Sequence, residues 1–64
     1  MERKKIQNIF DNGEIIEHYP IDYNPETGES ESNGGKEFLV KYNKKKYLIQ
    51  TNWNDEVFGG SLYK

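Results

Sequence analysis

The fold is decided by residues 38–53, FLVKYNKKKYLIQTNW. Apolar and aromatic residues alternate with others on both sides of the lysine run, which is typical of half-buried β-strands. The turn is either a two-residue loop at Asn43-Lys44 or a four-residue loop over residues 43–46. Both loops have an even length, so both place the same side chains on one face. The predicted core face carries Phe38, Val40, Tyr42, Tyr47 and Ile49, and the outer face carries Leu39, Lys41, Lys46, Leu48 and Gln50.

The composition describes one small β domain over residues 1–64. Nineteen of the 64 residues are Ile, Val, Tyr, Phe, Trp or Thr, and alanine is absent, so sheet is favoured over helix. The chain has no cysteine, which excludes disulfides and cysteine zinc sites. No apolar run is long enough for a signal peptide or a membrane span, so we expect a cytoplasmic protein without a membrane role. The 29 Lys, Asn, Ile, Tyr and Phe residues have AT-rich codons, as in low-GC bacteria and their phages.

The N-terminal part allows two interpretations. Asn12-Gly13 between apolar runs predicts a hairpin that pairs Phe10 with Ile15. The alternative over residues 2–10 is a short helix, since Ile6, Ile9 and Phe10 also fit helical spacing. The hairpin is preferred, because an isolated helix of this length is marginal in water.

The remaining segments predict further short strands. Residues 14–23 read as a strand in which Pro20 marks an edge, a bulge or a break. Residues 24–35 form a turn with Gly28 in the left-handed conformation, followed by a run without apolar residues that is either a flexible loop or the return strand of a hairpin arm. Residues 54–58 are a loop or one helical turn. Four to five short strands then give a small antiparallel sheet or a partly open SH3-like or OB-like barrel.

The charge of the chain is divided unevenly. The formal net charge is −2, yet residues 11–35 contain seven acids and no lysine or arginine, while the rest of the chain contains nine bases and four acids. Blocks of one sign often mark interaction surfaces, although neighbouring strands of opposite charge can also cancel one another. We therefore expect a non-enzymatic protein-binding module that docks a basic partner surface through the acidic segment 11–35, in the manner of a phage-type inhibitor or regulator. The residues expected to make the contact are Asp22, Glu26, Glu29 and Glu31.

The lysine-rich hairpin supports an alternative function. Lysines next to aromatic residues on small barrels bind single-stranded nucleic acid by neutralising phosphates and stacking bases. The residues for this alternative are Lys41, Lys44, Lys45, Lys46 and Trp53. Two observations weigh against it: the hairpin tyrosines belong to the core face, and the domain is acidic overall.

No other chemistry is indicated by the sequence. His18 is the only histidine and no serine lies in a nucleophile context, so we expect no catalytic activity, no cofactor and no metal. A homodimer is a further possibility, because Leu39 and Leu48 form a small apolar patch on the outer face and small domains gain stability by association.

Overall fold

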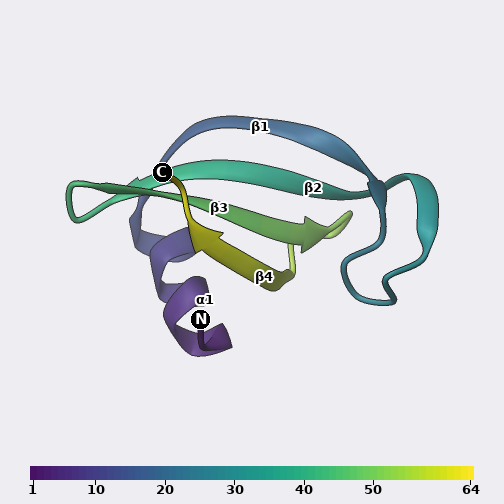
Figure 1. Cartoon of the computed structure of the whole chain (residues 1–64), viewed down its shortest axis with the longest axis horizontal. Coiled ribbons are helices and arrows are strands. Elements are labelled where there is room, and N and C mark those ends of the chain that lie inside the picture. Colours follow the sequence, from purple (N-terminus) through teal and green to yellow (C-terminus); the bar gives the residue numbers. More distant parts are fainter.

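The computed structural model describes residues 1–64 and shows one helix and four strands (Figure 1). The elements in chain order are α1 (Arg3–Asn12), β1 (Glu14–Tyr23), β2 (Ser30–Tyr42), β3 (Lys45–Asn52) and β4 (Val57–Leu62). The strands form one antiparallel sheet in the order β1-β2-β3-β4, so each strand pairs with the next one along the chain. The predicted class, a small antiparallel β protein, is confirmed, with four strands in an open sheet.

The central hairpin has the two-residue loop. Tyr42 pairs with Lys45 and Val40 pairs with Tyr47, which is the register expected for a loop at Asn43-Lys44. Both loop residues have positive φ, 52° and 67°, as a type I′ turn requires. The predicted core face is confirmed, because its side chains are buried or packed against the buried cluster.

The preference for an N-terminal hairpin was wrong, because residues 3–12 form α1. The helix ends at Gly13, whose backbone N–H donates to the carbonyl of Ile9 at 2.8 Å. Ile6 and Ile9 are 3% and 1% exposed. Burying an isoleucine side chain contributes about 1.5–3 kcal/mol, which outweighs the local preference of Asn-Gly for a turn. Without the helix, the core face of the central hairpin would remain open to water.

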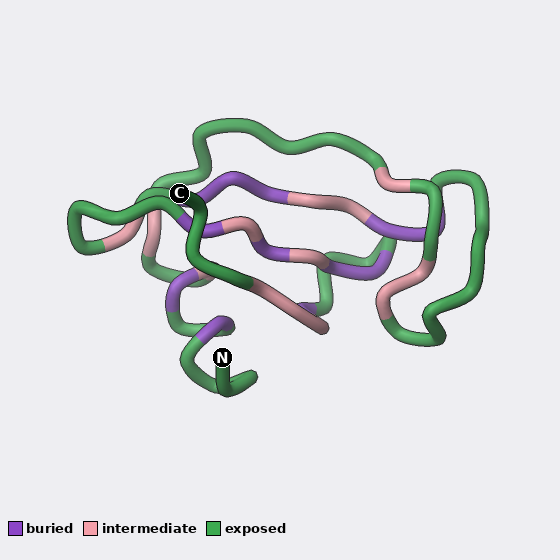
Figure 2. Tube along the Cα trace, viewed as in Figure 1, coloured by how far each residue is buried: buried purple, intermediate pink, exposed green.

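The core lies between α1 and the β2–β3 hairpin (Figure 2). Val40 and Ile49 are fully buried beside Ile9. The Phe10 ring meets the Phe38 ring edge-on, with centroids 4.9 Å apart. β1 contributes little to this core: it is an edge strand, exposed along nearly its whole length, as its proline suggested.

The segments on either side of the central hairpin are extended. Residues 30–35 belong to β2, so the second half of the segment 24–35 forms a return strand, as one of the two alternatives predicted. Its pairing with β1 is irregular: Ile21 pairs with Gly35 and Tyr23 with Ser30, and the residues between these pairs form a bulge. Residues 54–58 contain no helical turn: they complete the β3–β4 turn and begin β4.

Candidate functional site

The sheet register places a group of acids and a group of lysines at opposite ends of a molecule that is 33 Å long, although Glu14 of the predicted acidic segment pairs with Lys41 near the lysines. At one end, Ile21, Gly35 and Asn52 form a row across β1, β2 and β3. The β1–β2 and β3–β4 connections lie beyond this row (Figure 1). At the other end, the β2–β3 turn lies next to the C-terminus. We call these the acidic end and the basic end, and their residues are given below.

The acidic end combines two separate parts of the sequence. The four predicted contact residues, Asp22, Glu26, Glu29 and Glu31, are all exposed on or beside the β1–β2 connection. The β3–β4 turn adds two exposed acids that the sequence interpretation did not include, Asp55 and Glu56. They were missed because only the pairing of β2 with β3 brings this turn to the same end as the β1–β2 connection. Lys36 is the one base among these six acids.

The β1–β2 connection is a hydrogen-bonded turn that displays two of these acids. The carbonyl of Asn24 accepts from the N–H groups of Thr27 at 3.2 Å and Gly28 at 2.6 Å, and its side-chain Oδ1 accepts from the Glu26 N–H at 2.9 Å. Gly28 has a φ of 79°, as the turn sequence predicted. Backbone bonds thus fix the turn and leave the carboxylates of Glu26 and Glu29 exposed to solvent.

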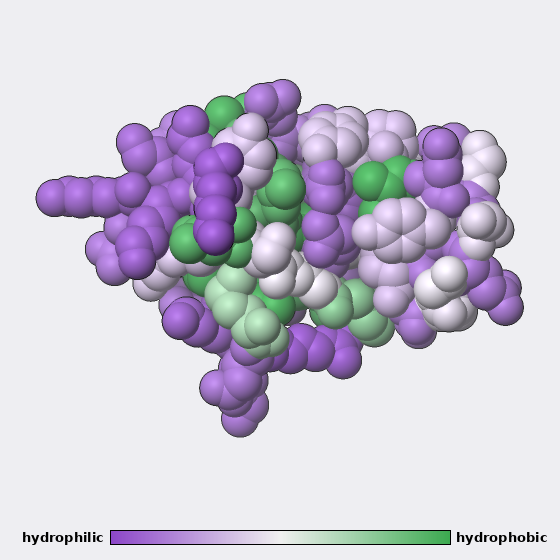
Figure 3. All heavy atoms as spheres, viewed as in Figure 1, coloured by the Kyte–Doolittle hydropathy of each residue, from purple (hydrophilic) through white to green (hydrophobic).

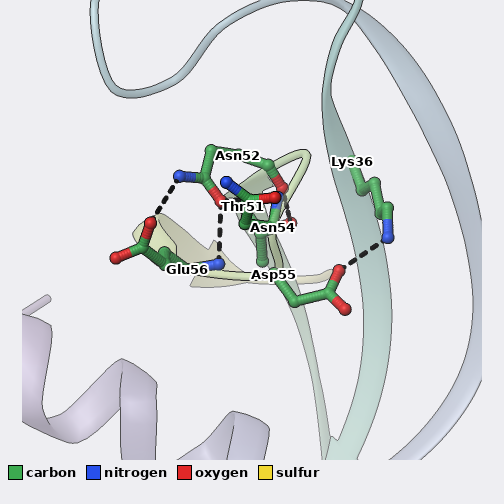
Figure 4. Close-up of polar contacts among 6 residues, drawn as sticks. All are labelled: Lys36, Thr51, Asn52, Asn54, Asp55 and Glu56. Atoms are coloured by element: carbon green, nitrogen blue, oxygen red, sulfur yellow. Dashed lines mark hydrogen bonds and ion pairs between the residues drawn. The ribbon is translucent and has the colours of Figure 1, made fainter.

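Asn52 holds the β3–β4 turn (Figure 4). It also reaches Glu26 of the β1–β2 connection. It is 6% exposed. Its Oδ1 accepts from the backbone N–H groups of Asn54 and Glu56, both at 2.9 Å. Its Nδ2 donates to the Glu56 carboxylate at 2.9 Å and, at the longer distance of 3.5 Å, to that of Glu26. One amide therefore brings together two carboxylates that are thirty residues apart in the sequence.

Lys36 partly balances the acidic end. Its Nζ lies 2.7 Å from Asp55 Oδ1, which is the only ion pair in the structure, and 5.1 Å from the centroid of the Trp53 ring. The Asp55 side chain is 53% exposed, so water screens this pair and its contribution to stability is small. The other five acids have no cationic partner within the chain.

The structure does not bring the alternative nucleic-acid residues together. Lys41, Lys44, Lys45 and Lys46 are exposed at the basic end, whereas Trp53 follows the far end of β3 at the acidic end. The intervening strand has eight residues, which at about 3.3 Å per residue separates Trp53 from the lysines by roughly 25 Å. The aromatic and basic components of that alternative therefore lie on different parts of the molecule.

A polar ladder crosses the outer face of the sheet. The Tyr19 hydroxyl donates to Glu37 Oε1, and Gln50 Nε2 donates to Glu37 Oε2 at 2.6 Å. The bond to the Glu37 carboxylate raises the pKa of Tyr19 above its ordinary value of 10.0, because ionisation of the phenol would break it. Leu39 and Leu48 pair across β2 and β3 on this same face.

No constellation of side chains in the structure has the form of a metal site. No three His, Asp or Glu residues lie close enough to share an ion. The His18 ring stacks on Phe38, with centroids 5.5 Å apart. No helix of the structure has the length and apolar character needed to cross a bilayer.

Comparisons with protein-family models, curated proteins and solved structures gave no match to this chain.

Proposed function

We propose that this chain is a small, non-enzymatic protein-binding module that docks a basic surface of a partner protein through its acidic end. The observation that carries the proposal is the convergence of Glu26 and Glu56 on Asn52, which gathers acids from two distant segments on one end of the molecule. By covering the basic surface of its partner, the module would inhibit or regulate that partner. We place this activity in the cytoplasm.

Electrostatic complementarity supports this mode of binding. Six exposed acids face solvent beside a single lysine, and clustered charges of one sign steer a partner of opposite sign and set the rate of association. Glu26, Glu29, Asp55 and Glu56 lie on turns closed by hydrogen bonds to the backbone, so little conformational entropy is lost when these turns dock. The interaction should weaken with salt, since the Debye length falls from about 30 Å at 0.01 M to about 8 Å at 0.15 M.

The proposal is tested by affinity capture with the full chain and a charge-reversal variant, E26K/E29K/E31K. The control E2K/E14K/E17K makes the same change in net charge at exposed acids outside the acidic end. We expect wild type and control to recover the same partner from the native host, and the acidic-end variant to lose it. Circular dichroism establishes that each variant is folded. Equal recovery by both variants would refute the proposal.

A further inference from the structure

Two adjoining hollows lie at the basic end, on either side of Leu62. One, of about 460 Å³, is lined by Lys44, Lys45, Lys46, Leu62, Tyr63 and Lys64. The other, of about 380 Å³, is lined by Met1, Lys5, Lys45, Tyr47, Gly60, Ser61 and Leu62. Lys45 and Leu62 belong to both, so the two hollows form one surface along the end of β4. Figure 3 shows hydrophilic side chains around this end of the molecule with apolar atoms between them.

The cations of this surface come from three separate parts of the chain: α1 supplies Lys5, the β2–β3 turn and the start of β3 supply residues 44–46, and the chain end supplies Lys64. No Asp or Glu side chain lines either hollow. The only ion pair of the structure involves Lys36 at the opposite end, so none of these five lysines has an anionic partner within the chain. The surface is complementary to a ligand that carries several negative charges.

The surface also exposes apolar side chains. Met1 is 52% exposed, Leu62 46% and Tyr63 47%, while the largely buried Tyr47 forms part of the floor. Large apolar side chains that cluster on the surface of so small a domain favour a contact with a protein rather than with a small ion. A suitable ligand therefore combines carboxylates with at least one apolar side chain.

An unpaired strand edge adjoins the hollows. β4 is the last strand of the sheet, and the only hydrogen bond it receives from outside β3 is the one from Arg3 Nε to the Val57 carbonyl at 3.1 Å. From Gly60 to Leu62, β4 pairs with β3 alone. An extended peptide can add to such an edge through its backbone, and it presents alternate side chains to the neighbouring surface.

We propose that the surface formed by the two hollows at the basic end binds an acidic, extended segment of a partner protein, which adds to β4 beside residues 60–62. The carboxylates of the segment lie against Lys5, Lys45 and Lys64, and an apolar side chain of the segment packs against Leu62. This site is independent of the acidic end. A protein segment is favoured over a nucleic acid because the strand edge pairs with a peptide backbone and because Trp53, the exposed indole, lies at the other end.

The first test uses the full chain and a fluorescein-labelled capped peptide that alternates glutamate with valine. We expect saturable binding that weakens roughly tenfold, or about 1.4 kcal/mol, in K45E/K64E. The control K4E/K41E makes the same charge change at exposed lysines outside the hollows and should bind like wild type. Absence of binding, or equal loss in both variants, would overturn the proposal.

Two further ligands test the class of partner. A peptide that alternates lysine with valine should not bind, and binding equal to that of the glutamate peptide would overturn the charge argument. A single-stranded oligothymidylate should not displace the glutamate peptide. If the oligonucleotide binds more tightly and depends on Lys45 and Lys64, the ligand is a nucleic acid and the proposal is wrong.

Strand addition is tested separately by N-methylation of the peptide. In an added strand the valine amides point to one edge and the glutamate amides to the other, and only one of these edges faces β4. Methylation of the amides that face β4 should abolish binding, whereas methylation of the other set should leave it unchanged. Equal binding of both methylated peptides would overturn strand addition. A second copy of the chain could also occupy the site, and sedimentation of the chain without peptide tests this. Self-association that K45E/K64E abolishes would assign the site to the acidic end of a second copy and would overturn the proposal of a different partner.

Discussion

Asn52 and Glu56 are joined by reciprocal hydrogen bonds: the Asn52 Oδ1 accepts from the Glu56 N–H, and the Asn52 Nδ2 donates to the Glu56 carboxylate, both at 2.9 Å. The Asn52 N–H also donates to the Glu56 carbonyl at 3.0 Å. Asn52 thus takes part in every bond that closes the β3–β4 turn around Glu56. The side chain of Asn54, two residues further on, makes no hydrogen bond in the structure and provides a matched comparison.

N52A should lower the free energy of unfolding by about 1–2 kcal/mol, because it leaves partly buried N–H groups without their acceptor. N54A should change it by less than about 0.5 kcal/mol, since only its backbone N–H is used. Urea denaturation followed by circular dichroism measures both values. Equal effects of the two substitutions would show that the side chain of Asn52 does not stabilise the turn.

Gly13 is required by the space available at the junction of α1 and β1. Its φ is −82°, which any residue can adopt. A Cβ at this position would lie 2.6 Å from the Ile9 carbonyl oxygen and 3.0 Å from that of Lys41, and it would collide with the Val40 side chain. G13A should therefore lower the free energy of unfolding by about 1–3 kcal/mol through overpacking.

The matched comparison for G13A is G28A. Gly28 has a φ of 79° and no atom within 4 Å of its ideal Cβ position, so its alanine variant should cost about 1–2 kcal/mol through backbone conformation alone. Substitution by asparagine, which tolerates positive φ, distinguishes the steric collision at Gly13 from the backbone strain at Gly28. G28N should recover most of the stability lost in G28A, whereas G13N should be no better than G13A. Thermal unfolding measures all four variants, and recovery in G13N would contradict the steric explanation.

The central hairpin could be predicted from the sequence because its signals are local. Alternation placed Val40 and Ile49 on the core face, and the even length of either loop made this assignment independent of register. The helix could not be assigned in the same way. Asn12-Gly13 is a strong local turn signal, and the burial of Ile6 and Ile9 against the sheet is a tertiary effect that no short window contains.

The charged surfaces could likewise be predicted only where their residues are close together in the sequence. Residues 22–31 could be predicted as an acidic surface because they are close together in the sequence. Asp55 and Glu56 could not, since only the β2–β3 pairing carries their turn to the same end. Lys5 lies beside the lysine hairpin through the packing of α1, and Lys64 through the pairing of β4 with β3. Trp53 lies apart from the lysines because the length of β3 separates them.

Lys44 occupies a position in the β2–β3 turn that favours glycine. Its φ is 67°, and a side chain in the left-handed region costs about 1–2 kcal/mol. K44G creates the Asn-Gly pair preferred in type I′ turns, so it should raise the free energy of unfolding by about 1 kcal/mol. K45G lies in the extended strand and should lower it by about 0.5–1 kcal/mol through lost side-chain packing and added backbone freedom. Chemical denaturation distinguishes them, and destabilisation by K44G would contradict the turn assignment.

The hydrogen bond from Tyr19 to Glu37 makes the free energy of unfolding decrease as the pH rises into the alkaline range. This bond favours the neutral phenol in the folded state and holds the pKa of Tyr19 above 10.0. A raised pKa means that the contribution is fully present below pH 10.0 and is lost as the pH rises through the folded pKa. The stability difference between wild type and Y19F should therefore be constant near neutral pH and should vanish in stronger alkali.

The pKa itself is measured from the absorbance of tyrosinate, by subtracting the titration of Y19F from that of wild type. The difference curve should have a midpoint above 10.0. E37A removes both the acceptor and the negative charge, so the midpoint for Tyr19 should fall towards 10.0 while the chain stays folded. A midpoint that does not respond to E37A would show that Glu37 is not the cause of the raised pKa.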